Sequence, residues 1–326
     1  MNQENKNLKV SEEINLIDDI LKSIKKVPSW VYAYNFNHHS PSQFNKPDDR
    51  WSFEYLFLTQ KQRREFAVNS KMMAGVAIGN IAQNVYGDHI YDAQNKNTIQ
   101  ESKNDKLYIK KHLQNEYVKY STEYKPTDDK DAQQLEWNKK GFAQTFENLA
   151  AAFKIVNLKG EVSCERTVHS ILKGCELPTI GRIDFETKDS IIELKTKWRR
   201  RTGKIRDDGS YSHSIYKISE NPTQEHLLQC WFYHLATGKK INLVIVQEDA
   251  YKIFNEDNCE ELRPHYKEIF EDKMRLIAIR RERLMARHDG KHTWTQDISL
   301  NMEHPFYWSI ADEHRNAAKE LWLKNL

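Results

Sequence analysis

The residues best suited to chemistry lie in one short stretch, the segment GRIDFETKDSIIELKTK at 181–197. The β-branched runs IGRIDF and SIIELKTK are separated only by ETKD, a pattern that predicts a β-hairpin. Side chains alternate between the two faces of a strand, so Ile192 and Leu194 would share one face and Glu193, Lys195 and Lys197 the other. Asp184 in the first strand can then approach Glu193 in the second.

Two neighbouring carboxylates repel each other, and a hard divalent cation with oxygen ligands, Mg²⁺ or Mn²⁺, compensates them directly. Such an ion polarises a phosphodiester and makes hydroxide available near neutral pH. Lys195 beside the acids would orient the attacking water or offset the charge that develops on the phosphorane. The alternative is an ordinary exposed hairpin with scattered charges, because this spacing also occurs by chance. The strand-turn-strand setting favours the metal site.

At these residues the chain resembles the PD-(D/E)xK nuclease superfamily, in particular its RecB-like and phage lambda-exonuclease-like branch. The core of that branch reads G-[RT]-[IV]-D, a hairpin and an acid-x-Lys strand, which residues 181–184 and 193–195 match. Three further matches occur in the expected order. They are the SPSQFN segment at 40–45, CER at 164–166, and QCWFY at 229–233, which fits the Q-x-x-x-Y helix motif.

The resemblance covers roughly residues 40–255 and implies an α/β fold with a restriction-endonuclease-like core. In this fold a mixed central sheet is flanked by helices. By resemblance, Asp184 and Glu193 are metal ligands, the Leu194 carbonyl is a third ligand, and Lys195 is catalytic. The implied cofactor is Mg²⁺ or Mn²⁺, as two ions.

Three more residues join the catalytic set by resemblance. Glu165 would lie on a helix that faces the metals. Gln229 and Tyr233 are at i and i+4, so they share one helix face, which we expect to point toward Asp184.

The sequence also departs from the family. Many RecB-like nucleases carry a histidine ligand on an early helix in a G-x-x-x-H context, whereas the best counterpart here, GVAIG at 75–79, has Gly79 at that place. Some members hold an iron–sulfur cluster through one early and three late cysteines. The region near Phe44 has no cysteine and the late part has no C-x₂₋₅-C pair, so we expect no iron–sulfur cluster.

A basic run leaves the predicted catalytic strand directly. KTKWRRRTGKIR at 195–206 has seven basic residues and no acidic one. It predicts a loop that holds the DNA backbone by neutralising phosphates, with a tryptophan that stacks on a base. The alternative is a solvated surface loop. The residues assigned to DNA binding are Lys197, Trp198, Arg199, Arg200, Arg201, Lys204 and Arg206.

Hydrophobic periodicity and turn residues predict the elements that position these residues: helices, then β-β-α-β, then helices. Helices are expected at 11–26, within 51–86, at 131–156, 221–240, 260–287 and 310–326, and strands at 241–247 and 250–254. The late basic helix either lines a groove with Arg280, Arg281, Arg283 and Arg287 or presents a solvated face. We expect one compact unit with a helical N-terminal part (1–150), a catalytic α/β core (151–255) and a helical C-terminal extension (256–326).

Composition narrows the class of protein. The 326 residues are 39% hydrophobic and 30% charged, which supports a real core, and the net charge of +3 means that a DNA-binding surface must come from local clustering. The four cysteines form no C-x-x-C pair and predict reduced thiols in a cytoplasmic protein. No apolar stretch approaches the roughly 18 residues that span a bilayer, and the polar start lacks a signal-peptide core, so no membrane partner is expected.

These observations lead to one function and two alternatives. The first is a Mg²⁺-dependent DNA exonuclease that hydrolyses phosphodiester bonds with metal-activated water in recombination, replication or DNA processing, with DNA and a recombination or replication protein as partners. The second is a structure- or sequence-specific endonuclease on the same core, although no DNA-reading motif is recognisable. The third is an inactive DNA-binding module, against which the intact Asp–Glu–Lys set argues.

Overall fold

The computed structural model describes residues 28–33, 36–59, 61–63, 69–87, 89–90, 106–158, 161–207, 209, 211–215, 217–304, 307, 310 and 312–323. The helix predicted at 11–26 lies outside these residues. The chain divides into two compact units: unit 1 comprises Met1–Phe66, His169–Ile180 and Ile269–Leu326, and unit 2 comprises Ala67–Val168 and Gly181–Glu268. The boundaries expected at residues 150 and 255 do not coincide with this division, because each unit combines segments that are distant in the sequence.

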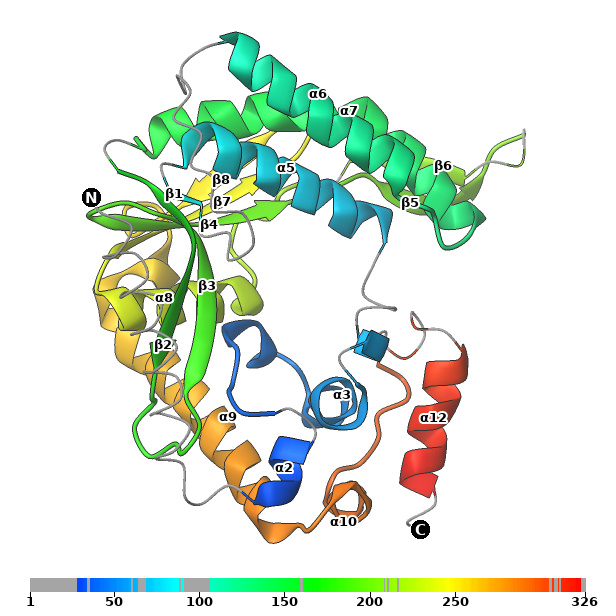
Figure 1. Cartoon of the computed structure of the whole chain (residues 1–326), viewed down its shortest axis with the longest axis vertical. Coiled ribbons are helices and arrows are strands. Elements are labelled where there is room, and N and C mark those ends of the chain that lie inside the picture. Colours follow the sequence, from blue (N-terminus) through cyan, green and yellow to red (C-terminus); the bar gives the residue numbers. More distant parts are fainter. Residues whose placement is uncertain are drawn as a thin grey trace, which may run out of the picture. The chain divides into compact units, whose positions relative to one another are not determined.

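A mixed sheet carries the predicted hairpin (Figure 1). In the described chain its strand order is β1 (His89–Ile90), β2 (Ser163–Ser170), β3 (Thr179–Glu186), β4 (Ser190–Thr196), β7 (Lys240–Val246) and β8 (Tyr251–Phe254). β3 and β4 pair in antiparallel fashion, with Phe185 opposite Ile192, so the hairpin prediction is confirmed. β4 pairs with β7 in parallel, β7 with β8 in antiparallel, and β1 with β2 in parallel fashion. The predicted mixed α/β class is therefore observed.

Helix α8 (Gln224–Thr237) belongs to the connection between the parallel strands β4 and β7. Thr223 caps its start, where the threonine side chain accepts a hydrogen bond from the N–H of His226. The helix ends at Gly238, whose φ of 71° is the left-handed conformation that glycine adopts without strain. Pro222 and Gly238 thus set the boundaries that the sequence predicts.

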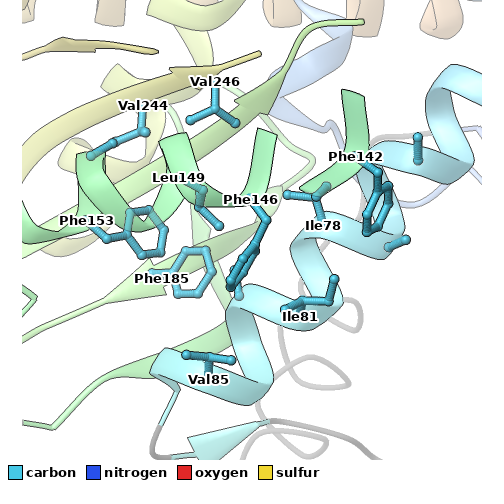
Figure 2. Packing of buried hydrophobic residues seen from close by; sticks show 14 of the residues in the cluster. Ile78, Ile81, Val85, Phe142, Phe146, Leu149, Phe153, Phe185, Val244 and Val246 are labelled. Carbon is cyan, nitrogen blue, oxygen red and sulfur yellow. The ribbon is translucent and has the colours of Figure 1, made fainter. Parts of the chain in front are cut away.

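Three long helices, α5 (Ser70–Tyr86), α6 (Lys106–Glu123) and α7 (Asp129–Ile155), also belong to unit 2. α5 and α7 lie on one side of β4 and β7, and α8 lies on the other (Figure 1). The side chains that fill the space between sheet and helices are apolar (Figure 2): Ile78, Ile81 and Val85 of α5, Phe142, Phe146, Leu149 and Phe153 of α7, and Phe185, Val244 and Val246 of the sheet. The spacing of three and four along α5 and α7 gives each helix one apolar face toward the sheet.

Unit 1 has shorter helices and an aromatic core. In its described part the helices are α2 (Ser29–Ala33), η1 (Pro41–Gln43), α3 (Asp48–Ser52), the π-helical turn η2 (Phe53–Phe57), most of α9 (Lys267–Arg287), α10 (Lys291–Asp297) and α12 (Asp312–Leu323). Trp51 and Trp294 are completely buried, with ring centroids 6.0 Å apart. The helix predicted from 260 begins only at Lys267, because the preceding residues form two short 3₁₀ turns, η3 (Glu260–Leu262) and η4 (Pro264–Tyr266).

Arg281 of α9 does not take the groove-lining position that is one of the two predictions for this helix. Its side chain is fully buried, lies 3.2 Å from Asp48 through Nε and Oδ1, and donates to the carbonyl oxygens of Gln43 and Lys46 at 3.2 and 2.8 Å. Its guanidinium also lies over the Trp51 ring, 4.5 Å from the centroid. Arg281 therefore stabilises the fold of unit 1 and does not line a groove for DNA.

No helix of the described residues is long and apolar enough to cross a membrane.

The buried ion pair of unit 1 gives a stability prediction. Asp48→Ala should lower the free energy of unfolding by about 3 kcal/mol, because it leaves the buried Arg281 charge without its carboxylate. Urea unfolding followed by tryptophan fluorescence measures this, since Trp51 contacts Arg281. Asp272→Ala, which breaks an exposed pair with Arg275, is the control and should change the free energy by less than about 0.5 kcal/mol. Equal effects of the two substitutions would contradict the prediction.

Candidate active site

The predicted carboxylates meet on neighbouring strands. Asp184 of β3 is half-buried, and one of its oxygens accepts a hydrogen bond of 2.8 Å from the N–H of Leu194. Glu193 of β4 is 2% exposed and forms an ion pair with Lys195, with 2.6 Å between Oε1 and Nζ. The other Glu193 oxygen, Oε2, is buried and has no hydrogen-bond partner among the described residues. An unpartnered buried oxygen beside a second carboxylate is what a bound cation would compensate.

The predicted alternation along β4 is confirmed. Ile192 belongs to the apolar cluster beneath α5 and α7, and Leu194 packs against that cluster. Lys195 instead reaches Gln229 of α8, on the other side of the sheet. The strand therefore has one face for the core and one face for chemistry.

Both carboxylates have raised pKa values. Burial and the charge of Glu193 raise the pKa of Asp184 well above its usual range, against the opposing effects of Lys195 and the Leu194 N–H. Burial also raises the pKa of Glu193, although Lys195 acts in the opposite direction. Burial alone would lower the pKa of Lys195, but the charges of Glu193 and Asp184 raise it above its usual value. The lysine therefore stays charged at neutral pH, and its single charge is shared between two acids.

A chain of hydrogen bonds from α8 fixes the position of Lys195. Its Nζ donates to Oε1 of Gln229 at 3.0 Å, the Gln229 amide donates to the hydroxyl of Tyr233 at 3.0 Å, and that hydroxyl donates to the Arg182 carbonyl at 2.7 Å. Burial and the charge of Glu193 raise the pKa of Tyr233, so the phenol keeps the proton that it donates. Gln229 and Tyr233 share one face of α8, as predicted, and this face is on the side of the sheet that carries Lys195.

Glu165 lies on a strand, β2, and not on the helix that the resemblance implies. The buried residues Val162, Cys164 and Val168 follow a period of two, and this strand pattern is obscured in the sequence by the charges of Glu165 and Arg166. Glu165 has a φ of 57°, which is rare for a residue other than glycine and is concentrated at functional sites. Its charge adds to the raised pKa values of both Asp184 and Glu193, so it is near the pair as predicted.

The sequence does not reveal the two residues that hold Glu165. The Gln83 amide of α5 donates to Glu165 Oε1 at 2.6 Å, and the Arg182 guanidinium pairs with Glu165 Oε2. Gly75, Gly79 and Gln83 follow at i, i+4 and i+8, the one sequence signal that could have placed Gln83 on the helix side facing the site. An added Cβ at Gly75 would lie 2.8 Å from Thr196 Oγ1, so this glycine lets α5 approach β4.

A further acid on β3 has a different environment. Glu186 is 4% exposed, but it is bound by the Arg166 guanidinium and lies 2.8 Å from Nζ of Lys239. Burial acts to raise its pKa, yet these two cations lower it below its usual value. Glu186 is therefore compensated by the protein itself, in contrast to Asp184 two residues earlier.

The residues of this site suit a magnesium ion that keeps several water ligands better than a metal whose ligands all come from protein side chains. Within the described ranges, no group of three or more His, Cys, Asp or Glu side chains is placed to hold a metal. Mg²⁺ is commonly bound through one or two carboxylates, with waters and substrate phosphates completing its octahedron. Asp184 and Glu193 provide that number of carboxylates.

The predicted DNA-binding run divides into two groups. Trp198 is 6% exposed and packs against Phe142 with ring centroids 6.2 Å apart, so stacking on a base is excluded. Arg199 is held by both carboxylate oxygens of Glu248. Lys197 is half-buried. Burial, then the charges of Lys195 and Lys197, lower the pKa of His226 of α8 to about 4.

The remaining cations of the run are exposed, and most lie on a strand where the sequence predicts a loop. β5 (Arg200–Ile205) pairs in antiparallel fashion with β6 (Tyr211–Ser214) as a separate two-stranded ribbon. Exposed cations of this segment are Arg200, Arg201, Lys204 and Arg206. The sequence contains the β-formers for this ribbon, Thr202, Ile205 and Tyr211, but the density of charge conceals them.

Comparisons with known proteins leave the family open. No known protein family matches the chain, and no curated protein matches it. Among solved structures, a chain titled "Crystal structure of SSO0001" is 17% identical over 49% of this chain and 69% of its own length, with a TM-score of 0.25. A likeness at this level supports no conclusion about fold or function.

The raised pKa of Asp184 predicts a stabilising substitution in the absence of metal. A carboxyl with a raised pKa in the folded state stabilises the protein below its unfolded pKa, and this stability is lost as the pH rises through the folded pKa. Asp184→Asn keeps an oxygen for the Leu194 N–H and removes the repelling charge. In EDTA near neutral pH it should therefore raise the unfolding temperature, and the gain should vanish near pH 4, about the ordinary pKa of Asp.

The matched control is Asp189→Asn, since Asp189 is exposed in the β3–β4 turn. It should leave the unfolding temperature unchanged at both pH values. An unchanged or lower unfolding temperature for Asp184→Asn at neutral pH would contradict the repulsion between Asp184 and Glu193.

Proposed function

We propose that this chain is a Mg²⁺- or Mn²⁺-dependent deoxyribonuclease with a PD-(D/E)xK core, acting as an exonuclease in recombination, replication or DNA processing. The observation that carries the proposal is the adjacent pair of half-buried Asp184 and buried Glu193, whose shared cation Lys195 is held in place by Gln229. Arg182 pairs with Glu165, so Asp184 and Glu193 are left to share one lysine. The site is therefore short of positive charge, and phosphodiester hydrolysis with a divalent cation uses such a site.

The metal-binding role falls to the two strand carboxylates. Asp184 and Glu193 would hold the ion through their oxygens, with the Leu194 carbonyl as a further ligand. When bound, Mg²⁺ or Mn²⁺ supplies Lewis acidity to the phosphodiester and lowers the pKa of its water toward neutrality. A second ion, which the family resemblance implies, would need Glu165 to exchange its contacts with Gln83 and Arg182 for the metal.

Lys195 acts as a fixed positive charge in this proposal. Its raised pKa means that it keeps its proton, so it offsets negative charge on the phosphate in the transition state and does not act as a base. Gln229 positions it, and Tyr233 positions Gln229 in turn. The exposed cations of the β5–β6 ribbon would bind the DNA.

Cleavage should require Mg²⁺ or Mn²⁺ and should be lost in EDTA. Asp184→Ala and Glu193→Ala should abolish it, whereas Lys195→Ala should retain metal binding and lose about two orders of magnitude in rate or more. Degradation of end-labelled DNA measures the rate, and a Mn²⁺-dependent rise of unfolding temperature measures binding. Asp189→Ala is the exposed control and should behave as the wild type. Full cleavage by either carboxylate variant would exclude this site.

The enzyme should act from DNA ends, as is common in the branch that the core motifs resemble. Linear DNA should be degraded to short products, while closed circular single- and double-stranded DNA survives under the same conditions. The comparison is made with one preparation and one Mg²⁺ concentration, followed on gels over time. Nicking of circles as fast as linear DNA is lost would instead support an endonuclease on the same core.

A further inference from the structure

The β5–β6 ribbon has a rigid root. Arg199, just before β5, donates to both oxygens of Glu248 and lies 2.6 Å from Nε2 of His213 in β6. His213 packs on Trp137 of α7, with ring centroids 4.3 Å apart. Gly141 leaves room for Glu248, since an added Cβ there would collide with its side chain. These contacts fix the positions of β5 and β6 where the ribbon leaves the rest of unit 2.

Beyond this root the ribbon is open to solvent. Every residue of β5 is exposed except the half-buried Thr202, and the residues of β6 are half-buried. The register shifts between Arg201, opposite His213, and Ile205, opposite Tyr211. Such a bulge increases local twist and re-aims side chains. In Figure 1 the ribbon lies beside the start of α7 and extends away from the six-stranded sheet.

Its outer part combines cations with an apolar pair. Ile205 is 64% exposed and stands opposite Tyr211. The Arg201 guanidinium lies over the Tyr211 ring, 4.3 Å from the centroid, which holds the arginine in place at an exposed position. Lys204 and Arg206 add positive charge beside this pair. Phosphate binding alone would explain the cations but not the exposed isoleucine.

We propose that the β5–β6 ribbon enters the major groove of duplex DNA, which makes double-stranded B-form DNA the substrate class; this inference rests on the proposed nuclease function. The major groove, about 12 Å wide, admits a two-stranded β-ribbon, whereas the minor groove is about 6 Å wide. Thymine methyl groups and the guanine O6 and N7 atoms line the major groove, and they match Ile205 and Arg201 in chemistry. Double-stranded RNA presents a major groove too deep and narrow for side chains to read, and a single strand has no groove.

Binding to three probes of one sequence tests this inference. Fluorescence anisotropy is measured with the full chain carrying Asp184→Asn, which prevents cleavage, on duplex DNA, duplex RNA and single-stranded DNA. Adding Arg201→Ala and Ile205→Ser should weaken duplex DNA binding about tenfold or more, as loss of one base contact does. Binding of the other two probes should change less than about twofold. Lys154→Ala, at the exposed far end of α7, is the control and should leave all three affinities unchanged.

Two outcomes would overturn the inference: equal losses on all three probes, which indicate a grip on phosphates alone, or no loss on any. Methylation of guanine N7 provides a second readout, since it should weaken binding of the chain with the intact ribbon and have little effect on the ribbon variant. Circular dichroism of the ribbon variant checks that it is folded, and Ile205→Val should retain binding.

The outcomes separate this inference from the proposed function. If the wild type cleaves linear DNA but binding does not depend on the ribbon, only the inferred contact with the major groove is refuted. If duplex binding depends on the ribbon but no cleavage occurs in Mg²⁺, the nuclease function is refuted and the contact with the major groove is retained.

Discussion

The structure of unit 2 depends on placing two like charges, Asp184 and Glu193, on adjacent strands in a largely buried site. Burial and mutual repulsion both raise the pKa of Asp184. A single lysine, Lys195, provides the positive charge beside the two acids. The position of that lysine matters because it pairs with one Glu193 oxygen, while the other oxygen has no hydrogen-bond partner within the described chain. The α8 face that carries Gln229 and Tyr233 supplies the hydrogen bonds that fix this position.

The comparison with Glu186 shows that this shortage of positive charge is local. Asp184 and Glu186 both belong to β3 and lie two residues apart on one face of the strand. Glu186 is paired with two cations, Arg166 and Lys239. The protein can thus neutralise a buried acid fully where only structure is required. Around Asp184 and Glu193, the third acid Glu165 is matched by Arg182 and the first two acids share Lys195. With all three acids ionised, one negative charge is left over, and a bound cation would compensate it.

The sequence predicts the local parts of this arrangement well. The alternation in SIIELKTK, the turn before it and the ends of α8 near Pro222 and Gly238 depend on neighbouring residues, and all three are observed. Partners that are distant in the sequence decide the rest. In the sequence, Trp198 and Arg199 resemble DNA-binding residues, but in the structure Trp198 packs on Phe142 and Arg199 is bound by Glu248. Arg281 likewise resembles a surface residue in the sequence, but in the structure it is buried against Asp48. β2 is obscured for another reason, since its charged residues pair within the structure and interrupt the apolar pattern of a strand.

Helix α5 shows how the ligand set limits the choice of metal. By the resemblance, Gly79 takes the place of a histidine, and an added Cβ there would meet nothing within 4 Å among the described residues. One turn later, Gln83 delivers an amide to Glu165 through a donated hydrogen bond of 2.6 Å. The helix thus contributes a neutral donor that orients an acid, and no nitrogen ligand. Zinc favours sites closed by nitrogen and sulfur ligands, whereas magnesium tolerates two carboxylates and retains its waters. Without a histidine on α5, the two carboxylates would match magnesium better than zinc.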